Sequence, residues 1–206
     1  MTLAPVQPQW LGRLSYRWAW RLQHLRRQAV IEGRAPEAFW LLTHDPVITT
    51  GRRPVADLPT HLEVVRTERG GLATYHGPGQ LIGYLILDVG RRNTKVKGTI
   101  CAVEAGIIRW LETRGVLASR RPGYPGIWVG RDKICAVGMH FRRGVSMHGF
   151  ALNLTVDLRG FDSIVPCGIT DGGVTSLAAI CGEAPEPRHV ADEVGRCLVD
   201  TPGLLG

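Results

Sequence analysis

The sequence lacks several features that would place it quickly in a class. In its 206 residues no apolar run approaches the roughly 18 residues that a membrane-spanning helix needs. The opening stretch, MTLAPVQPQWLGRL, has no basic segment followed by an apolar run, so a secretory signal is not expected. Both absences favour a cytoplasmic protein.

Cysteine is scarce, odd in number and never paired as Cys-x-x-Cys. Five cysteines stand at positions 101, 135, 167, 181 and 197. Because disulfide frameworks use even numbers of cysteines, this pattern favours reduced thiols. Cys135, His140, His148 and Cys167 can be drawn as a zinc set, but their spacing matches no standard zinc motif, so we expect no metal.

What is present suits a folded protein with a basic surface. Hydrophobic residues make up 44% of the chain and charged residues 21%, which allows a proper core. The net charge of +7 attracts acidic partners, such as nucleic acid or an acidic carrier protein. The arginine pairs are scattered along the chain, however, and such pairs are most often a solvated surface.

Apolar periodicity predicts one α+β domain over residues 1–206. Apolar residues recur at spacings of three and four in three segments, which predicts amphipathic helices over 11–32, 95–114 and 188–199. Thr175-Ser176-Leu177 can cap a further short helix. Strands are expected over 38–44, 47–53, 63–71 and 80–89, and an antiparallel meander over 126–130, 133–141 and 145–158.

Three segments could carry chemistry. The first is the glycine-rich stretch RGGLATYHGPGQLIGY, residues 69–84, which is neither a P-loop nor GxGxxG. Its glycines let the backbone approach a ligand, although a plain tight loop between strands is equally consistent with it. The second is GRDKICAVG, in which Lys133 begins an apolar strand. Most lysines are exposed, but one at the mouth of a buried strand can act as a base or pair with a thiolate.

The third segment, DSIVPCGITDGG, places Cys167 at a turn. A structural cysteine usually sits inside a regular element, as Cys101 and Cys197 are expected to do. A thiol in a turn is instead reachable, and a neighbouring cation would increase the nucleophilic thiolate fraction. Cys135 lies two residues after Lys133 on the same predicted strand, so it shares a sheet face with Lys133 and stays open as an alternative.

The strings RGGLATYHGPGQLIGY, PGIWVGRDKICAVG, MHGFALN and VPCGI, in this order over residues 50–177, resemble the lipoyl(octanoyl) transferase family. The resemblance implies the fold of biotin and lipoate protein ligases, a mixed β-sheet packed with helices. It implies transfer of an octanoyl or lipoyl group from acyl carrier protein, without a cofactor. The acceptor would be a lysine on lipoyl domains of 2-oxoacid dehydrogenases or on the glycine-cleavage H protein, with no role for nucleic acid or membrane.

The same resemblance assigns residues. The family's catalytic cysteine and lysine map onto Cys167 and Lys133. The resemblance implies that the acyl group is transferred through a thioester on the cysteine. Its substrate-binding segments map onto Arg69, Gly70, Gly71, Leu72, Ala73, Thr74, Tyr75, His76, Ala136, Val137, Gly138, Gly149, Phe150 and Ala151. His76 and His148 would be positioning residues or structural histidines.

An octanoyl chain requires a narrow apolar slot. We expect room for it beside Gly70, Gly71, Gly77 and Gly79, with apolar walls from Leu72, Val137, Met139 and Phe150. On this view, a bulky residue at Gly149 would shorten the accepted chain.

Three rival functions fit the sequence less well. An ATP-dependent lipoate or biotin protein ligase shares the fold, but the GRGRxG-type loop of biotin ligases is absent. A non-catalytic binding module would explain the basic charge but not the cysteine and lysine. A Cys-His hydrolase could use His140 or His148 as its base, yet no hydrolase signature surrounds Cys167.

Overall fold

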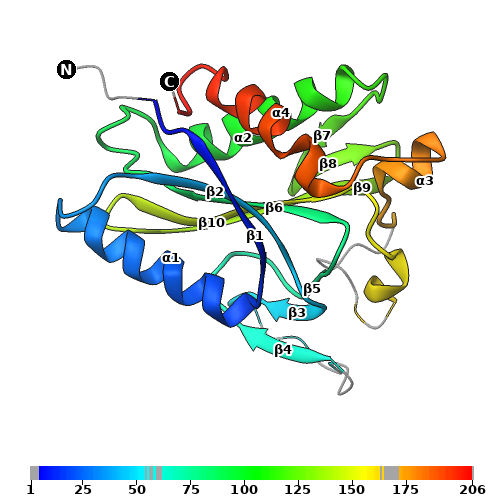
Figure 1. The fold of residues 1–206 in the computed structure, drawn as a ribbon, viewed down its shortest axis with the longest axis horizontal. Coiled ribbons are helices and arrows are strands. Elements are labelled where there is room, and N and C mark those ends of the chain that lie inside the picture. Colours follow the sequence, from blue (N-terminus) through cyan, green and yellow to red (C-terminus); the bar gives the residue numbers. More distant parts are fainter. Residues whose placement is uncertain are drawn as a thin grey trace.

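A seven-stranded mixed sheet crosses the molecule in the computed structural model, which describes residues 5–53, 55, 58, 62–162, 164 and 172–205 (Figure 1). The strand order is β1-β2-β6-β10-β9-β8-β7. The strands span Pro8–Leu14 (β1), Ala38–His44 (β2), Gln80–Ile86 (β6), Ser119–Arg121 (β7), Tyr124–Val129 (β8), Asp132–Arg142 (β9) and Val145–Asn153 (β10). Strands β1 and β2 are parallel, and every other neighbouring pair is antiparallel.

A second, three-stranded sheet with the order β4-β3-β5 lies at one end of the large one. It contains Val47–Thr50 (β3), Glu63–Arg66 (β4) and Thr74–His76 (β5). Strand β3 follows β2 directly after the interruption at Asp45-Pro46, and it pairs Val47 with His76 and Thr49 with Thr74. The small sheet therefore brings the glycine-rich stretch back toward the large sheet.

Helices cover both faces of the large sheet (Figure 1). Helix α1, Tyr16–Ile31, lies on one face, and α2, Val96–Glu112, and α4, Pro187–Val199, lie on the other. The remaining helical turns are η1, Leu158–Phe161, and α3, Leu177–Cys181. The larger apolar cluster fills the space under α2 and α4, and a smaller one lies under α1. None of the described helices is long and apolar enough to cross a bilayer.

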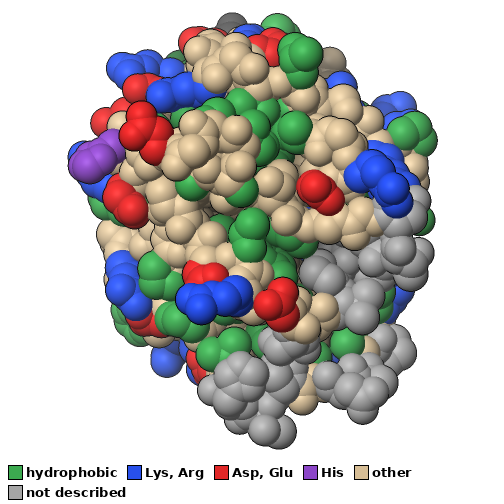
Figure 2. Space-filling model, turned by 90° about the vertical axis from the view of Figure 1, so that its right-hand side faces the viewer, with side chains coloured by type: hydrophobic (Ala, Val, Ile, Leu, Met, Phe, Trp, Pro, Cys, Tyr) green, Lys and Arg blue, Asp and Glu red, His purple; other side chains and the backbone are tan. Residues whose placement is uncertain are grey.

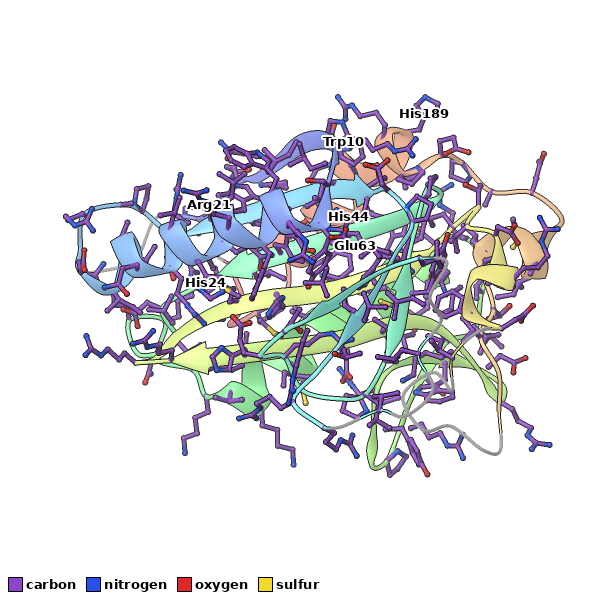
Figure 3. The ribbon with its side chains drawn as sticks, turned by 90° about the horizontal axis from the view of Figure 1, so that it is seen from below. Trp10, Arg21, His24, His44, Glu63 and His189 are labelled. Atoms are coloured by element: carbon purple, nitrogen blue, oxygen red, sulfur yellow. The ribbon has the colours of Figure 1, made fainter. Side chains whose placement is uncertain are left out.

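The prediction of an amphipathic helix over 11–32 is wrong at its start, and two of the apolar residues that produced its period are exposed. Residues 8–14 form β1, which pairs with β2, because sheet pairing overrides the local helical period. Within α1, Trp18 and Leu25 are 52% and 61% exposed, whereas Gln23 and Arg27 are buried. The helix, which lies along the sheet in Figure 3, thus turns a partly polar face toward the sheet, and Tyr16 at its start lines the cavity described below.

The other helices and the meander are confirmed, with smaller differences. Gly115 has φ +71 just beyond α2, as expected for a helix C-terminal glycine. Ser176 caps α3 by accepting a hydrogen bond from the backbone N–H of Ala179. The strand predicted over 63–71 ends at Arg66, and the short strands β5 and β7 were not predicted. The prediction of an α+β chain with a mixed sheet holds.

Candidate functional site

A cavity of about 700 Å³ lies where the glycine-rich stretch meets β9 and β10. Among the residues predicted from the sequence, those that line it are Arg69, Gly70, Gly71, Leu72, Thr74, His76, Lys133, Ala136, Val137, Gly138, Met139, His148, Gly149, Phe150 and Ala151. Segments far apart in the chain therefore form one site. Its size is within the range of about 300–1,000 Å³ that is typical of small-ligand sites.

Two predicted binding residues do not line the cavity. In β5, Thr74 and His76 face it, whereas the ring of Tyr75 packs edge-on against Phe161 on the other side. Ala73 is fully buried in the same apolar cluster as Tyr75. Side chains alternate between the two faces of a strand, which explains why Thr74 and His76 face the cavity and Tyr75 does not. The sequence analysis grouped these residues together because it did not predict β5 as a strand.

The cavity opens along one edge of β9. Strand β8 pairs with β9 only from Asp132 to Cys135, whereas β10 pairs with β9 as far as Arg142. From residue 136 onward β9 therefore has a described strand on one side only. This explains why four consecutive residues, 136–139, all line the cavity.

Lys133 lies at one end of this cavity and is only 6% exposed. Its Nζ is 4.8 Å from the ring centroid of Trp128, a distance at which the ring attracts a cation. Gly126 makes room for the side chain, because a Cβ there would lie 3.3 Å from Lys133 Cε and 2.5 Å from the carbonyl oxygen of Cys135. Lys133 is therefore not one of the exposed lysines that are most frequent in proteins, although its role is not tested by its position alone.

The backbone of Lys133 holds the segment at 173–175. The Lys133 N–H donates to the carbonyl of Gly173, and the Thr175 N–H donates to the carbonyl of Lys133, both at 3.0 Å. The Gly173 N–H also donates to the Asp132 carboxylate at 2.7 Å. Cys167 and its neighbours at 165–171 lie outside the described residues, so the structure does not test the predicted cysteine.

Cys135, the alternative nucleophile, is fully buried in the larger apolar cluster. Burial raises the pKa of its thiol, which makes a thiolate at neutral pH unfavourable. None of the described cysteines lines the cavity. Cys135 is a structural residue.

Arg69 holds the glycine-rich stretch in place from inside the protein. Its Nη2 donates to the carbonyl and the hydroxyl of Thr49 at 2.7 and 2.9 Å, and its Nη1 donates to the carbonyl of Gly70 at 3.0 Å. Gly51 lets the stretch approach β3, since a Cβ there would lie 2.3 Å from the carbonyl oxygen of Gly71. The stretch is a packed part of the cavity wall.

The far end of the cavity is polar and includes residues that the sequence analysis missed, Tyr16 and Tyr84. The Tyr84 hydroxyl donates to Nε2 of His44 at 2.7 Å, and His44 Nδ1 donates to the carbonyl of Leu14 at 2.7 Å. Figure 3 shows His44 beside the first part of α1, and the ring of Tyr16 lies 5.1 Å from it. Tyr84 could have been found from its spacing, because Gln80 and Tyr84 stand four positions apart in an otherwise apolar strand and therefore share one face.

The buried histidines at this end are neutral. Burial, opposed by the hydrogen bond to Leu14, lowers the pKa of His44 to about 4. Burial and the nearby His44 lower the pKa of His76 to about 3. Both rings therefore act as hydrogen-bonding groups at neutral pH.

His148 combines burial with an unusual backbone. It is 2% exposed and has φ +63 inside β10, where a residue other than glycine is uncommon. Its N–H donates to Oε1 of Gln23 at 2.8 Å, and its Nε2 lies 3.9 Å from the Glu68 carboxylate. Burial lowers the pKa of His148. Contacts with α1 thus fix this part of the cavity wall.

The expectation that Gly77 and Gly79 widen the cavity is wrong, whereas the effect of a bulky residue at Gly149 on chain length stays a prediction. Cβ atoms at Gly77 and Gly79 would meet the Tyr75 hydroxyl and the backbone at Val156, so these glycines pack the loop rather than widen the cavity. A Cβ at Gly149 would lie 2.2 Å from the carbonyl oxygen of Gly83 in β6. Gly149 is required for the approach of two strands.

The imagined zinc set finds no support in the described part of the chain. No group of three or more described His, Cys, Asp or Glu residues gathers as metal ligands would. Cys135 lies in the apolar core, and His140 Nδ1 is 2.8 Å from the guanidinium of Arg27.

Comparison with known proteins gives consistent matches. The family model described as the lipoyl protein ligase A/B catalytic domain matches residues 15–199. A protein of Novosphingobium aromaticivorans named octanoyltransferase is 47% identical over 82% of this chain and 79% of its own. A mitochondrial protein of Danio rerio, named octanoyl-acyl-carrier-protein:protein N-octanoyltransferase, is 40% identical over 86% of this chain and 84% of its own.

A solved structure confirms the fold. The putative lipoate protein ligase of Thermoplasma acidophilum superposes with a TM-score of 0.72 at 15% identity, covering 97% of this chain and 86% of that one. The predicted ligase-like fold, a mixed sheet with helices against it, is therefore correct.

Proposed function

The chain belongs to the lipoyl protein ligase A/B catalytic domain family, and we propose that it is an octanoyltransferase using a cysteine and a lysine. The donor would be octanoyl-acyl carrier protein. The acceptor would be a lysine of a lipoyl domain or of the glycine-cleavage H protein. The names of the relatives from Novosphingobium and Danio support octanoyl transfer, and the name of the Danio protein gives octanoyl-acyl carrier protein as its donor.

The observation that carries the proposal is the position of Lys133. It is a buried lysine at the end of a cavity with apolar walls, and its backbone is hydrogen-bonded to the segment that follows the predicted cysteine. An acyl chain is apolar and a thioester carbonyl is polar, so such a cavity suits an acyl thioester. Leu72, Val137 and Phe150 supply apolar surface for the chain.

The proposed reaction has two acyl transfers. The thiolate of Cys167 attacks the thioester carbonyl, forms a new S–C bond and expels the carrier's thiolate, which takes a proton from the ammonium of Lys133 and leaves as the thiol. The acceptor amine then attacks the thioester on Cys167, forms the amide and passes its proton to the now neutral Lys133, while Cys167 is released as the thiolate. Splitting one transfer into two lets the protein partners use the same surface in turn.

Lys133 has a role in each transfer. As an ammonium it stabilises the thiolate of Cys167, because an opposite charge nearby favours the ionised form. As a neutral amine it accepts the proton of the attacking acceptor lysine, which reacts only when uncharged. Backbone N–H groups next to Cys167 or in the facing glycine-rich stretch would stabilise the oxyanion of each tetrahedral intermediate.

The surface charge suits acidic protein partners. The chain carries a net charge of +7. On the face shown in Figure 2, however, basic and acidic side chains are intermixed rather than separated. We therefore expect electrostatics to speed the encounter more than to strengthen the complex, so the association rate should fall as salt is added.

Intact-protein mass spectrometry tests the proposal. The purified protein is mixed with octanoyl-acyl carrier protein in the absence of ATP. We expect one octanoyl adduct that maps to Cys167, is absent from Cys167→Ala and is discharged by an apo lipoyl domain. Modification of the acceptor only with ATP and free octanoic acid would identify a ligase instead. Absence of transfer under both conditions would leave a binding module.

A further inference from the structure

A chain of buried hydrogen bonds connects the glycine-rich stretch to the segment beside Lys133. His76 Nδ1 lies 2.7 Å from Gln80 Oε1, and Gln80 Nε2 lies 2.8 Å from Asn153 Oδ1. Asn153 Nδ2 donates to the carbonyl of Thr175 at 2.9 Å. At the other end, the Thr49 hydroxyl lies 3.3 Å from His76 Nε2 and accepts from Arg69.

The chemistry of the two ends fixes the direction of every bond. The Thr175 carbonyl only accepts, so Asn153 presents its amide nitrogen there and its oxygen to Gln80. Gln80 must then donate to Asn153 and accept from His76, which makes His76 the neutral Nδ1–H tautomer. Thr49 donates to His76 Nε2 because a guanidinium, which only donates, bonds to its oxygen. A single arrangement of protons satisfies the chain.

The chain of hydrogen bonds is almost completely shielded from water. Thr49, His76, Gln80 and Asn153 are all 8% exposed or less. A buried polar group that loses its partner is costly, so each member constrains the next. Gln80 and Asn153 are also direct partners in the ladder of β6 and β10, which places their side chains on one face.

The last link reaches Lys133. Thr175 accepts from Asn153 through its carbonyl and donates through its N–H to the carbonyl of Lys133. One amide side chain thus fixes the segment that lies along the backbone of Lys133, immediately after the residues that include Cys167.

We propose that Asn153 is a positioning residue of the transfer reaction, which holds the segment at 173–175 against Lys133 through the carbonyl of Thr175. This inference rests on the proposed function for its kinetic consequence only. Asn153 itself contacts no reacting atom. Its effect is to keep the strand of Lys133 and the segment after Cys167 in register.

Two substitutions separate this role from simple packing. Asn153→Ala removes both hydrogen bonds. Asn153→Asp keeps the shape and still accepts from Gln80, but its carboxylate cannot donate to Thr175 and faces a carbonyl oxygen. The matched control is Ser146→Ala, because Ser146 is also buried in β10 and hydrogen-bonds to Leu85 in β6 and to Leu87 just after it, without any link to the hydrogen-bond chain.

Hydrogen–deuterium exchange tests the structural part without any substrate. We expect the amides of Lys133 and Thr175 to exchange about tenfold faster in both Asn153 variants than in the wild type, since loss of one hydrogen bond is worth roughly one factor of ten. Ser146→Ala should leave both amides unchanged. Equal exchange in Asn153→Asp and the wild type would overturn the inference, because that variant preserves the packing.

Single-turnover transfer tests the kinetic part. In both Asn153 variants the rate should fall about tenfold or more, with an unchanged KM for octanoyl-acyl carrier protein, because the docking surface is untouched. In a Lys133→Ala background, Asn153→Ala should have little further effect, since the two act as a unit. Additive losses, or a loss equal to that of Ser146→Ala, would show a merely structural role. If the wild type transfers nothing without ATP, the proposed function fails, whereas the exchange result still decides the inference.

Discussion

The side chain of Arg69 passes directly over Gly138 of β9. A Cβ built on Gly138 would lie 3.5 Å from Arg69 Cδ and 3.8 Å from the carbonyl oxygen of Gly70. Both are ordinary van der Waals distances, so an alanine fits here without moving the backbone. Its methyl group would occupy the space between β9 and the glycine-rich stretch, and Gly138 therefore sets the width of the cavity at this point.

We predict that Gly138→Ala shifts the acyl-chain preference toward shorter chains, and that Gly138→Val shifts it further. One methylene of fit is worth about 1–3 kcal/mol in an apolar pocket, or roughly 10- to 200-fold in relative kcat/KM. The measurement is the ratio of kcat/KM for hexanoyl- and octanoyl-acyl carrier protein. Gly98→Ala, on the exposed side of α2, is the control. A ratio equal to that of the wild type would show that Gly138 does not limit the chain.

Gly149→Ala should behave differently, although Gly149 also lines the cavity. The added Cβ would collide with the carbonyl oxygen of Gly83 at 2.2 Å and with Leu85 at 2.8 Å. Because backbone must move to relieve this contact, we expect a loss of stability of about 1–3 kcal/mol. Urea unfolding measures the loss. A stable variant with a shortened chain preference would contradict this prediction and restore the interpretation drawn from sequence.

The buried histidines predict a fall in stability on mild acidification. His44 and His76 have pKa values of about 4 and about 3 in the folded protein, against an ordinary value of 6.5. Between pH 6.5 and 4 the unfolded chain binds protons that the folded protein does not, so the free energy of unfolding falls as pH decreases. The slope is about 1.4 kcal/mol per pH unit for each histidine, and the contribution is fully retained above pH 6.5.

Urea unfolding between pH 7.5 and pH 4.5 measures this slope. His44→Asn keeps a donor toward the carbonyl of Leu14 but cannot be protonated. The slope should therefore decrease by the contribution of one histidine, about 1.4 kcal/mol per pH unit. The exposed His189, labelled with His44 in Figure 3, supplies the control. His189→Asn should leave the slope unchanged. Identical slopes for wild type and His44→Asn would mean that His44 accepts a proton in the folded state.

Much of the fold could be predicted from the sequence because its elements carry strong local signals. The apolar period of α2, the glycine after it and the short polar turns between the apolar strands β8, β9 and β10 each match one conformation. The start of α1 could not be predicted in this way. Residues 11–14 continue the helical period, but pairing with β2 decides their structure, and that partner is distant in sequence.

The candidate site was predictable where its residues stand in recognisable motifs. Lys133 and the stretch from Arg69 to His76 are such cases, apart from the orientation of Tyr75. Tyr16 could not be found because it looks ordinary in its own segment, and Asn153, although it ends the string MHGFALN, gives no sign there of its partner. Only the tertiary structure brings Tyr16 over His76, at 5.8 Å between ring centroids, and Asn153 onto Thr175.

The ion pair between Arg92 and Glu37 joins the loop before α2 to the start of β2. The guanidinium donates to both carboxylate oxygens, at 2.9 and 2.7 Å, and also to the carbonyl of Leu204. The side chains are only 4% and 10% exposed. The Glu37 carboxylate accepts a further hydrogen bond, from the Asp88 N–H.

We predict that Arg92→Met lowers the free energy of unfolding by about 3–5 kcal/mol, because it leaves the carboxylate of Glu37 buried without its counter-charge. Adding Glu37→Gln should recover part of the loss, since a neutral amide is cheaper to bury and can still accept from Asp88. Arg159→Met, which breaks the exposed pair of Arg159 with Asp157, should cause no resolvable change. Urea unfolding of the three variants, including the double one, beside the wild type measures these differences. Suppose instead that adding Glu37→Gln lowered the free energy of unfolding further than Arg92→Met alone. The uncompensated carboxylate could then not be the cause of the destabilisation, and the lost hydrogen bond to the carbonyl of Leu204 would explain it better.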